Sequence, residues 1–354
     1  MSIIPAMNLA ETLLSLCRIA SPIGEEGELC DTIAARLARY PLRRYGNSLV
    51  VPVRRGSGGP KVALAGHLDT VRTVHDAPPR IEGERLYGAG AADMKSGLAL
   101  MLDVAEAPPD GSDLTLVFYA REEGPFDENE LGPVLAADPE LAQVDVAVAL
   151  EPSDNKLQLG CGGSLHAKVS FHGRTAHSAR PWQGENAIHK AAPLLARLGA
   201  LEPSSSRIDG LEWKRVVSAT LASGGRAKNV VPDLFELNLN HRFGPDLSPA
   251  EAERVVRELV GDDAEVEVVD LAPPAPPFRA HPLVQALVES GALAVEPKTG
   301  WTDVARFAAL GIPAVNFGPG TQAQAHQRNE WTLLPALDEG RRILRAWLAR
   351  VGAG

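Results

Sequence analysis

Gly88-Ala-Gly-Ala-Ala-Asp-Met-Lys-Ser-Gly97 places a single carboxylate, Asp93, among small residues. Glycine and alanine let the backbone turn sharply and pack closely, so this segment can hold one acid rigidly at the edge of a sheet. The apolar run Met94–Ala105 predicts a buried helix whose N-terminal N–H groups face the same place. Taken alone, the segment fits a glycine-rich turn with a solvated acid better than a site. Other polar residues along the chain favour the site.

Polar side chains recur where predicted strands end. Short apolar runs bounded by turns predict strands buried in a parallel sheet, and ligands in open α/β sheets gather at the carboxyl ends of the strands. A histidine or an acid stands at such an end after Lys61–Ala65, Asp113–Ala120 and Val144–Leu150, namely His67 with Asp69, Glu122 with Glu123, and Glu151.

Spacing suggests different roles within these pairs. In extended backbone, residues two apart point to the same side, so His67 can bind a metal while Asp69 orients it. Adjacent Glu122 and Glu123 point to different sides, which lets one bind metal while the other transfers a proton. Each pair also has an ordinary interpretation, as a surface histidine with a capping acid or as a solvated acidic loop.

The ligand types favour one class of metal. Together with Asp93 and the late His326, the strand-end groups offer imidazole nitrogen and carboxylate oxygen without thiolate. Such a set suits Zn²⁺ with an open position for water better than a closed structural zinc, and Co²⁺ or Mn²⁺ would also fit.

Composition excludes several other classes of protein. The 354 residues are 45% hydrophobic and 23% charged, as in a soluble globular enzyme of about two domains. A net charge of -10 argues against nucleic-acid binding, which needs clustered basic residues. The 3 cysteines are irregularly spaced, which indicates buried thiols in a reducing compartment. No apolar run approaches a membrane span. We therefore expect a soluble cytoplasmic protein with neither a nucleic-acid nor a membrane partner.

The order of predicted elements indicates an α/β protein with an insertion. Strands and helices alternate over residues 1–162, which predicts a mixed, largely parallel sheet between helices. Residues 163–272 read as strand-helix-strand-strand-helix-strand, a ferredoxin-like α+β pattern. The Pro-rich segment Ala272–Pro277 predicts a stiff return to the first domain, which residues 273–354 complete. A polyproline ligand is the alternative interpretation of that segment.

Local patterns also predict particular elements. Ser48–Val53 and Lys61–Ala65 flank a Gly-Ser-Gly-Gly turn and predict paired strands. Gly184–Leu198 and His281–Val295 each predict one continuous helix.

Six motifs follow one another in a fixed order along the chain. They are Gly66-His-Leu-Asp-Thr70, Gly88–Gly97 with Asp-Met-Lys, Glu122-Glu-Gly124, Glu151-Pro152, Gly173-Arg-Thr-Ala-His177-Ser178 and Ala325-His326. In this order they resemble the dizinc aminoacylase and carboxypeptidase family, which includes acetylornithine deacetylase and succinyl-diaminopimelate desuccinylase. The resemblance covers nearly the whole chain. Within the family, Trp301–Phe307 and Gly311–Gly320 are most similar to the actinobacterial type of desuccinylase.

Position by position, the resemblance implies two Zn²⁺ per subunit in a zinc-peptidase-like catalytic domain. Asp93 would bridge the two ions. His67 and Glu151 would hold one ion, and Glu123 and His326 the other. The resemblance also implies a cis peptide bond after Asp93.

The resemblance further implies the catalytic groups. Asp69 would orient His67, and Glu122 would act as general base. The inserted domain would be a lid and dimerisation domain of a homodimer, with His177 reaching the neighbouring subunit's site to stabilise the developing oxyanion.

The implied substrate is a small N-acyl amino acid. Asn229 and Arg242 would hold its succinyl carboxylate, and Thr302 would assist. Two departures from the family bear on this pocket, namely Ala89 in place of a frequent arginine and an unusually acidic loop at Gly124–Gly132. Neither involves a proposed ligand.

The implied activity is metal-dependent hydrolysis of N-succinyl-LL-2,6-diaminopimelate to succinate and LL-2,6-diaminopimelate, in lysine and diaminopimelate biosynthesis. A related hydrolase of acetylornithine, another N-acyl amino acid or a dipeptide would share every metal ligand and differ in pocket contacts. A catalytically silent scaffold protein would lack a ligand or the base, and the sequence retains them all.

Overall fold

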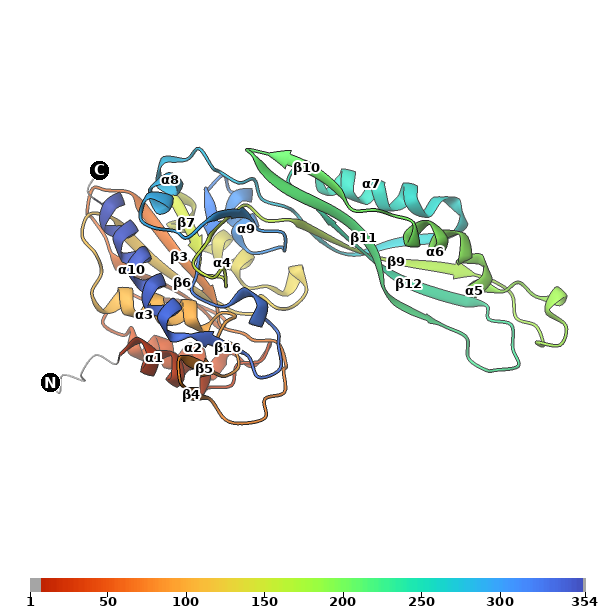
Figure 1. The fold of residues 1–354 in the computed structure, drawn as a ribbon, viewed down its shortest axis with the longest axis horizontal. Coiled ribbons are helices and arrows are strands. Elements are labelled where there is room, and N and C mark those ends of the chain that lie inside the picture. The colour runs from red at the N-terminus through yellow and green to blue at the C-terminus, as the bar shows by residue number, and fades with distance from the viewer. Residues whose placement is uncertain (1–7, 353–354) are drawn as a thin grey trace. The chain divides into compact units, whose positions relative to one another are not determined.

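The computed structural model describes residues 8–352 as two compact units (Figure 1). The first unit contains the described residues up to Gly160, the segment Pro277–Glu296 and the residues from Asp303 onward. The second unit contains Cys161–Pro276 and Pro297–Thr302. The second unit is therefore inserted into the first. The short segment Pro297–Thr302, which follows Glu296, belongs to the second unit again.

An eight-stranded sheet forms the centre of the first unit, in the order β1-β2-β6-β3-β7-β15-β8-β14. Strand β3 (Lys61–His67) pairs parallel with β6 (Asp113–Tyr119) and with β7 (Val146–Ala149), and β7 pairs parallel with β15 (Ala314–Asn316). β2 pairs antiparallel with β6, and β15 antiparallel with β8. The predicted mixed, largely parallel sheet is confirmed. The other strands are β1 (Arg43–Tyr45), β2 (Ser48–Arg54), β8 (Leu157–Leu159) and β14 (Val295–Pro297).

Helices pack against this sheet in two groups. α3 contacts β3 and is itself contacted by α1 and α10, which lie beside it in Figure 1. α9 contacts β7 and β15, and α4 contacts α9. The connections β3-α3-β6 and β6-α4-β7 run in opposite directions along the sheet, so right-handed crossovers place α3 and α4 on opposite faces. The helices are α1 (Leu9–Cys17), α2 (Gly27–Arg36), α3 (Lys95–Glu106), α4 (Leu131–Ala137), α8 (Pro282–Glu289), α9 (Val304–Ala309) and α10 (Leu334–Val351).

Small structural elements complete the first unit. A three-stranded sheet has the order β16-β5-β4, and 3₁₀ turns connect several elements. Its strands are β4 (Arg80–Glu82), β5 (Arg85–Tyr87) and β16 (Trp331–Leu333). The 3₁₀ turns of the chain are Phe126–Glu128, Leu141–Gln143, Pro181–Gln183, Gly261–Asp263 and Gln322–Gln324.

The predicted pairing of the strands around the Gly-Ser-Gly-Gly turn is wrong. β6 lies between β2 and β3 in the sheet and pairs with both. β3 is buried along Val62–His67, so it needs a partner on each edge, and the partners it finds are the parallel strands β6 and β7. The turn connects two strands that are not neighbours.

Gly97 brings the start of α3 close to the end of β7. A Cβ at this position would lie 2.4 Å from the carbonyl oxygen of Leu150. Only glycine allows this approach, because any side chain would overlap backbone. The approach brings Asp93, just before α3, close to Glu151, just after β7.

The second unit contains a five-stranded antiparallel sheet in the order β10-β11-β12-β9-β13. Without the edge strand β10, the four remaining strands have the ferredoxin-like order that the sequence predicted. The prediction missed β10. The strands are β9 (Gly163–His172), β10 (Ser204–Ile208), β11 (Leu211–Gly224), β12 (Leu234–Phe243) and β13 (Glu265–Ala272).

Buried and more exposed residues alternate along β9, and the buried ones form part of the core of the second unit. Leu165, Ala167, Val169 and Phe171 lie on one face and join the buried side of α7 (Pro249–Val260) in a single apolar cluster. A Ser248–Glu251 capping box fixes the start of α7. Helices α5 (Ala187–Lys190) and α6 (Ala192–Gly199) contribute to the same cluster.

Two helix predictions need correction. Gly184–Leu198 is not one helix, because residues 184–186 are extended or lie in a bridge to Arg174 and because Pro193 coincides with a break between α5 and α6. His281–Val295 is helical only over Pro282–Glu289, since Gly291 takes a φ of 108° and the chain continues into β14.

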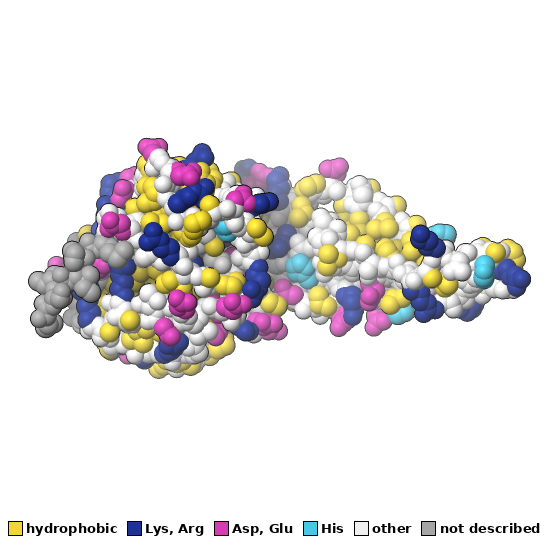
Figure 2. Space-filling view, turned by 90° about the horizontal axis from the view of Figure 1, so that it is seen from below, with side chains coloured by type: hydrophobic (Ala, Val, Ile, Leu, Met, Phe, Trp, Pro, Cys, Tyr) yellow, Lys and Arg dark blue, Asp and Glu magenta, His cyan; other side chains and the backbone are white. Residues whose placement is uncertain are grey.

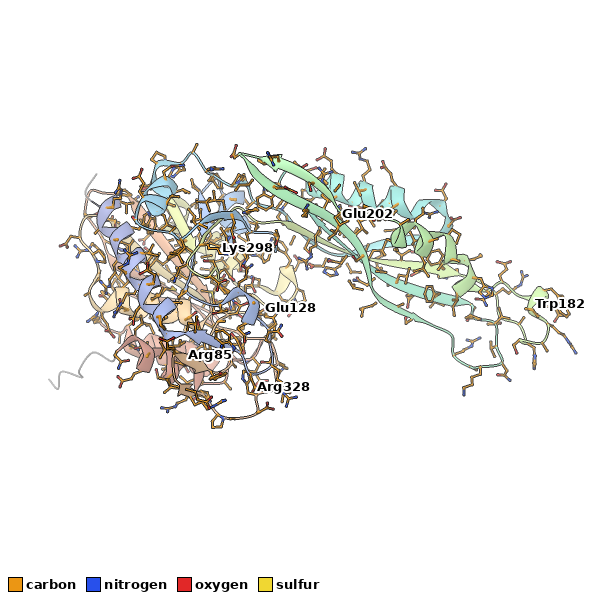
Figure 3. All side chains as sticks on the ribbon, in the orientation of Figure 1. Arg85, Glu128, Trp182, Glu202, Lys298 and Arg328 are labelled. Carbon is orange, nitrogen blue, oxygen red and sulfur yellow. The ribbon has the colours of Figure 1, made fainter. Side chains whose placement is uncertain are left out.

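The surface carries both signs of charge. On the face seen in Figure 2, Lys and Arg side chains lie interspersed with those of Asp and Glu. Trp182 is 76% exposed in the 3₁₀ turn Pro181–Gln183, which precedes α5 in the second unit (Figure 3). Among residues 8–352, no helix has the length and hydropathy needed to cross a bilayer.

Candidate metal centre

Asp93 lies between two histidines from distant parts of the chain. Its Oδ1 is 3.1 Å from Nε2 of His67, and its Oδ2 is 3.5 Å from Nε2 of His326. Each carboxylate oxygen therefore faces a different imidazole. This arrangement is the one expected of a carboxylate that bridges two cations.

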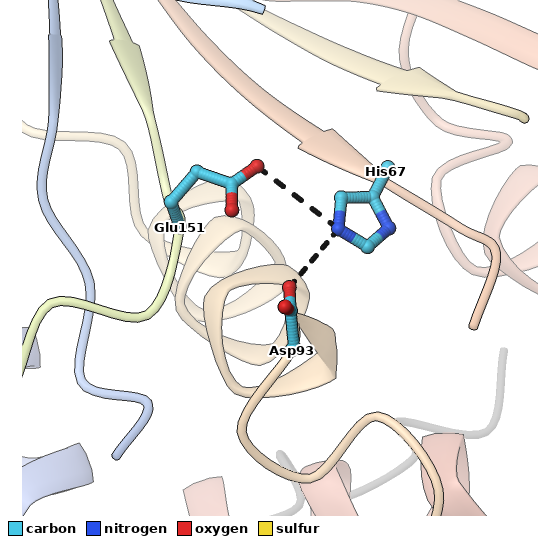
Figure 4. Close-up of side chains that lie close together, drawn as sticks. All are labelled: His67, Asp93 and Glu151. Carbon is cyan, nitrogen blue, oxygen red and sulfur yellow. Dashed lines mark hydrogen bonds and ion pairs between the residues drawn. The ribbon is translucent and has the colours of Figure 1, made fainter. Parts of the chain in front are cut away.

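The first set of ligands consists of His67, Asp93 and Glu151 (Figure 4). All three are buried. Both carboxylates approach the same ring nitrogen of His67, with Glu151 Oε1 at 4.0 Å. His67 ends β3, Glu151 follows β7, and these strands are parallel neighbours, so the sheet itself places the two side chains together.

The second set consists of Asp93, Glu123 and His326. Glu123 Oε1 lies 2.8 Å from His326 Nε2, and the His326 side chain is 51% exposed. The two sets share Asp93 and lie in one place, although their histidines are 259 positions apart in the sequence, at 67 and 326. The Asp93–Met94 peptide bond is cis, as the resemblance implies.

Asp69 holds two parts of the site at once. Its backbone carbonyl accepts a hydrogen bond from Nδ1 of His67 over 2.9 Å, which leaves Nε2 facing Asp93. Its carboxylate accepts the backbone N–H groups of Glu122 and Glu123, over 3.0 and 2.8 Å. The expected orientation of His67 thus comes from the main chain of Asp69, while its side chain anchors the glutamate pair.

The acids of the site raise the pKa values of both histidines in the metal-free protein. For His67, burial opposes this effect, but the hydrogen bond with Asp93 and the nearby carboxylates raise its pKa well above the usual value. For His326, the hydrogen bond with Glu123 raises the pKa to about 9. The carboxylates around both imidazoles therefore favour their protonated forms.

The adjacent glutamates are also perturbed. Burial raises the pKa of Glu122 well above the usual value, and Glu151 and Glu123 add to this effect. Burial likewise raises the pKa of Glu123, while the hydrogen bond with His326 opposes the shift. A carboxyl group with a raised pKa is suited to accepting and returning a proton.

The donor set fits a pair of divalent cations. Imidazole and carboxylate donors converge from five strand ends and loops. Cys17, Cys30 and Cys161 are buried, and none of the three is in a disulfide. Two triads that share one carboxylate can hold two ions with Asp93 as the bridge. The acidity of the site also favours positive charge.

The predicted substrate-contacting residues lie in the second unit, in two separate places. The segment of His177 runs beside that of Asn229, because His177 bridges to Val230 and the Ser178 N–H donates to the Asn229 carbonyl. Arg242 lies at the other end of β12, paired in register with Ser164.

Arg242 and Thr302 flank the same short segment. Ser164 is the strand partner of Arg242, and the Cys161 thiol donates to the Thr302 carbonyl over 3.5 Å. At 3.4 Å per residue, the length of β12 separates Arg242 from Asn229 by roughly 25 Å or more. The expectation that Asn229 and Arg242 both hold the succinyl carboxylate therefore stays a prediction, and it requires the two residues to come from different subunits.

The sequence interpretation gave no role to Glu330, yet this side chain is buried behind the bridging acid. It accepts the backbone N–H groups of Gly90, Ala92 and Asp93. Burial raises its pKa to about 7, although these N–H groups oppose the shift. The only sequence signal was its place four residues after His326.

A family model described as peptidase family M20/M25/M40 matches residues 63–350. A Corynebacterium glutamicum protein named succinyl-diaminopimelate desuccinylase is 38% identical over 348 residues, covering 94% of each chain. A Mycobacterium tuberculosis protein, provisionally named succinyl-diaminopimelate desuccinylase DapE, is 40% identical over 344 residues, covering 96% of this chain and 97% of the relative.

Solved structures agree on the fold. A tripeptidase from Staphylococcus aureus matches with a TM-score of 0.81 at 22% identity, covering 98% of both chains. The M20 family metallo-carboxypeptidase Sso-CP2 from Sulfolobus solfataricus matches with a TM-score of 0.80 at 15% identity, covering 99% of this chain and all of the other. With the family model and the near full-length relatives, the conclusion is direct: the chain belongs to peptidase family M20/M25/M40.

Proposed function

We propose that this protein is a metal-dependent amidohydrolase that converts N-succinyl-LL-2,6-diaminopimelate and water to succinate and LL-2,6-diaminopimelate. The main support is the pair of ligand triads that share Asp93. The substrate assignment rests on the two relatives with 38% and 40% identity, which are named for this reaction.

The metal centre in this proposal contains two Zn²⁺. His67, Glu151 and Asp93 would hold one ion, and Glu123, His326 and Asp93 the other. When bound, the ions would supply Lewis acidity toward water and toward the amide carbonyl.

Glu122 is the general base in this proposal. It lies within reach of His67 and Glu123, with which it forms a third close group, but it belongs to neither triad that shares Asp93. Its raised pKa matches a proton carrier. It takes a proton from the attacking water and delivers a proton to the departing amine, so the carbonyl carbon gains an oxygen as the C–N bond breaks. Asp69 keeps Glu122 in place through the backbone N–H.

The substrate contacts require a homodimer in this proposal. Because β12 separates Asn229 and His177 from Arg242, one subunit would supply the first two residues and its neighbour the third. Arg242, with Thr302 nearby, would bind the succinyl carboxylate through its planar guanidinium. His177 would donate a hydrogen bond to the carbonyl oxygen as it gains charge.

The proposal is tested by measuring kcat/KM of zinc-loaded protein on N-succinyl-LL-diaminopimelate, N-acetylornithine and a dipeptide. We expect the succinylated amine to be preferred by about 100-fold or more, because the other substrates would leave the half-buried Arg242 guanidinium without its carboxylate partner. A preference for acetylornithine or the dipeptide would overturn the substrate assignment but retain the amidohydrolase class. Failure on all three amides with two metals bound would overturn the catalytic proposal.

A further inference from the structure

The loop before the bridging acid wraps around a buried carboxylate. Glu330 Oε1 accepts the N–H groups of Ala92 and Asp93 over 2.7 and 2.8 Å, and Oε2 accepts the Gly90 N–H over 2.9 Å. The Gly88 N–H donates to the Glu330 carbonyl over 3.0 Å. Glu330 is 3% exposed. Four N–H groups of one short loop therefore converge on this single residue.

Burial of the Glu330 carboxylate costs free energy unless other groups replace its hydration. A buried carboxylate loses its hydration, and a second acid, Asp93, lies beside it and raises its pKa. Backbone N–H groups in such a concave loop can offset the loss, because they bind anions. The buried Lys95 side chain interacts with Glu330 only through its charge and donates its hydrogen bond to the Ile19 carbonyl over 2.7 Å. The loop itself is thus the partner of Glu330.

The conformation of the loop that precedes Asp93 depends on the buried Glu330 carboxylate. Gly90 has a φ of 77°, and a Cβ there would lie 2.9 Å from Thr70 Cγ2. Because Gly90 is free of a side chain, its N–H can turn inward toward Oε2. Without an acceptor, three N–H groups would be buried beside the bridging acid with no hydrogen bond.

The segment that carries Glu330 also carries a metal ligand. His326 stands four residues earlier, and the residues between them are tied to another loop. The Asn329 side-chain carbonyl accepts the Asp76 N–H over 2.8 Å, and Arg328 pairs with the Asp76 carboxylate. Arg328 lies on the outer side of the first unit in Figure 3. One short segment therefore sets the position of His326 and, through Glu330, that of Asp93.

We propose that Glu330 is a positioning residue that holds Asp93 in register with His326, so that one carboxylate can bridge two cations. This inference rests on the proposed two-metal centre. Its specific content is that Glu330 acts on metal affinity through the Asp93 backbone, without touching the metals. Groups that support ligands in this way typically account for about 10- to 100-fold in metal affinity or activity.

The test is Glu330→Gln, which preserves shape. The amide oxygen can keep the bonds to Ala92 and Asp93, but its NH₂ group must then face the Gly90 N–H. The matched control is Asp138→Asn, which also neutralises a buried acid that accepts a backbone N–H, here from Glu140. The other partners of Asp138 are Arg43 and Tyr45, and neither is a proposed ligand.

Two readouts separate positioning from general destabilisation. Chelator competition should show two bound Zn²⁺ in the wild type and in Asp138→Asn, and a loss of affinity of about 10-fold or more in Glu330→Gln. Hydrogen exchange of the metal-free proteins should be faster at the Gly90 amide in Glu330→Gln alone, because this is the N–H group that loses its acceptor.

Failure of the role proposed for Glu330 can be distinguished from failure of the proposed metal centre. If the wild type binds two Zn²⁺ and Glu330→Gln binds them equally tightly, the positioning role is overturned while the metal centre stands. The same holds if Asp138→Asn loses as much affinity as Glu330→Gln. If the wild type binds no divalent cation, the proposed centre is overturned, and this inference with it.

Discussion

The carboxylate of Asp69 accepts the backbone N–H of Glu122 over 3.0 Å, which ties the end of β3 to the end of β6. These strands are parallel neighbours, with His67 in register with Tyr119. The same residue fixes His67 through its carbonyl. Asp69 therefore affects both metal binding, through its carbonyl, and proton transfer, through its carboxylate. A substitution can change the carboxylate and leave the carbonyl in place.

Asp69→Asn should therefore separate catalysis from metal binding. The amide can accept one of the two N–H groups of Glu122 and Glu123 but must place its NH₂ against the other. We expect kcat to fall by about 10- to 100-fold, with a smaller change in Zn²⁺ affinity because the carbonyl still orients His67. Steady-state kinetics and chelator competition measure the two effects.

Asp145→Asn is the matched control for that experiment. Its carboxylate accepts the backbone N–H of Lys61 over 2.8 Å, at the opposite end of β3. It should leave kcat close to the wild-type value. An equal loss of kcat in both variants would contradict the role assigned to Asp69.

Glu122→Gln removes the proposed proton carrier and keeps its size. Because Gln cannot accept a proton, we expect kcat to fall by about 100-fold or more, within the range for loss of a general base. Zinc stoichiometry should remain two per chain, since the five proposed ligands are unchanged. Near-normal turnover of the variant would remove Glu122 from the mechanism.

Zinc binding should release protons at neutral pH. The pKa of His326 is raised to about 9 in the metal-free protein, so at pH 7 its imidazole is protonated and must lose that proton to bind a cation. Below pH 9 the apparent affinity should therefore rise by at least about tenfold per pH unit. Titration calorimetry in buffers of different ionisation enthalpy counts the protons. Zinc binding at pH 7 without proton release would contradict this assignment.

Much of the metal centre could be predicted because parallel strands bring their carboxyl ends together. His67, Glu122 and Glu151 each follow a recognisable apolar strand, so their convergence follows from the fold class. His326 follows no such strand, so the fold class alone did not place it beside Asp93, and its pairing with Glu123 was implied by the resemblance to a family. Glu330 was missed because its contacts with the Asp93 loop span up to 240 positions and leave no local pattern.

The wrong predictions of strand pairing and helix length also come from contacts between distant parts of the chain. The turn between β2 and β3 looks like a hairpin, yet β6 enters between them from about sixty residues later in the chain. Helical periodicity continues through His281–Val295, but this local pattern does not show that Val295 belongs to strand β14. Pairing partners are decided by the whole sheet, whereas propensity acts over a few residues.

The proposed sharing of substrate contacts across a dimer predicts complementation. His177 and Arg242 lie at opposite ends of the second unit's sheet, so each site in a twofold dimer would take His177 from one chain and Arg242 from the other. His177→Ala and Arg242→Ala should each be nearly inactive alone. Unfolding and refolding them together should produce heterodimers in which one site carries both changes and the other carries neither.

Random pairing makes half of the dimers mixed, so the mixture should regain about one quarter of wild-type kcat. The control is a mixture of Arg242→Ala with Glu122→Gln, whose changes should both lie with the same chain's metal centre. Each mixed dimer would then have one defect per site, and no activity should return. No recovery in the first mixture would mean that His177 and Arg242 serve each site from the same chain. Recovery in the control would mean that Arg242 serves the metal centre of the neighbouring chain, which contradicts the proposed sharing.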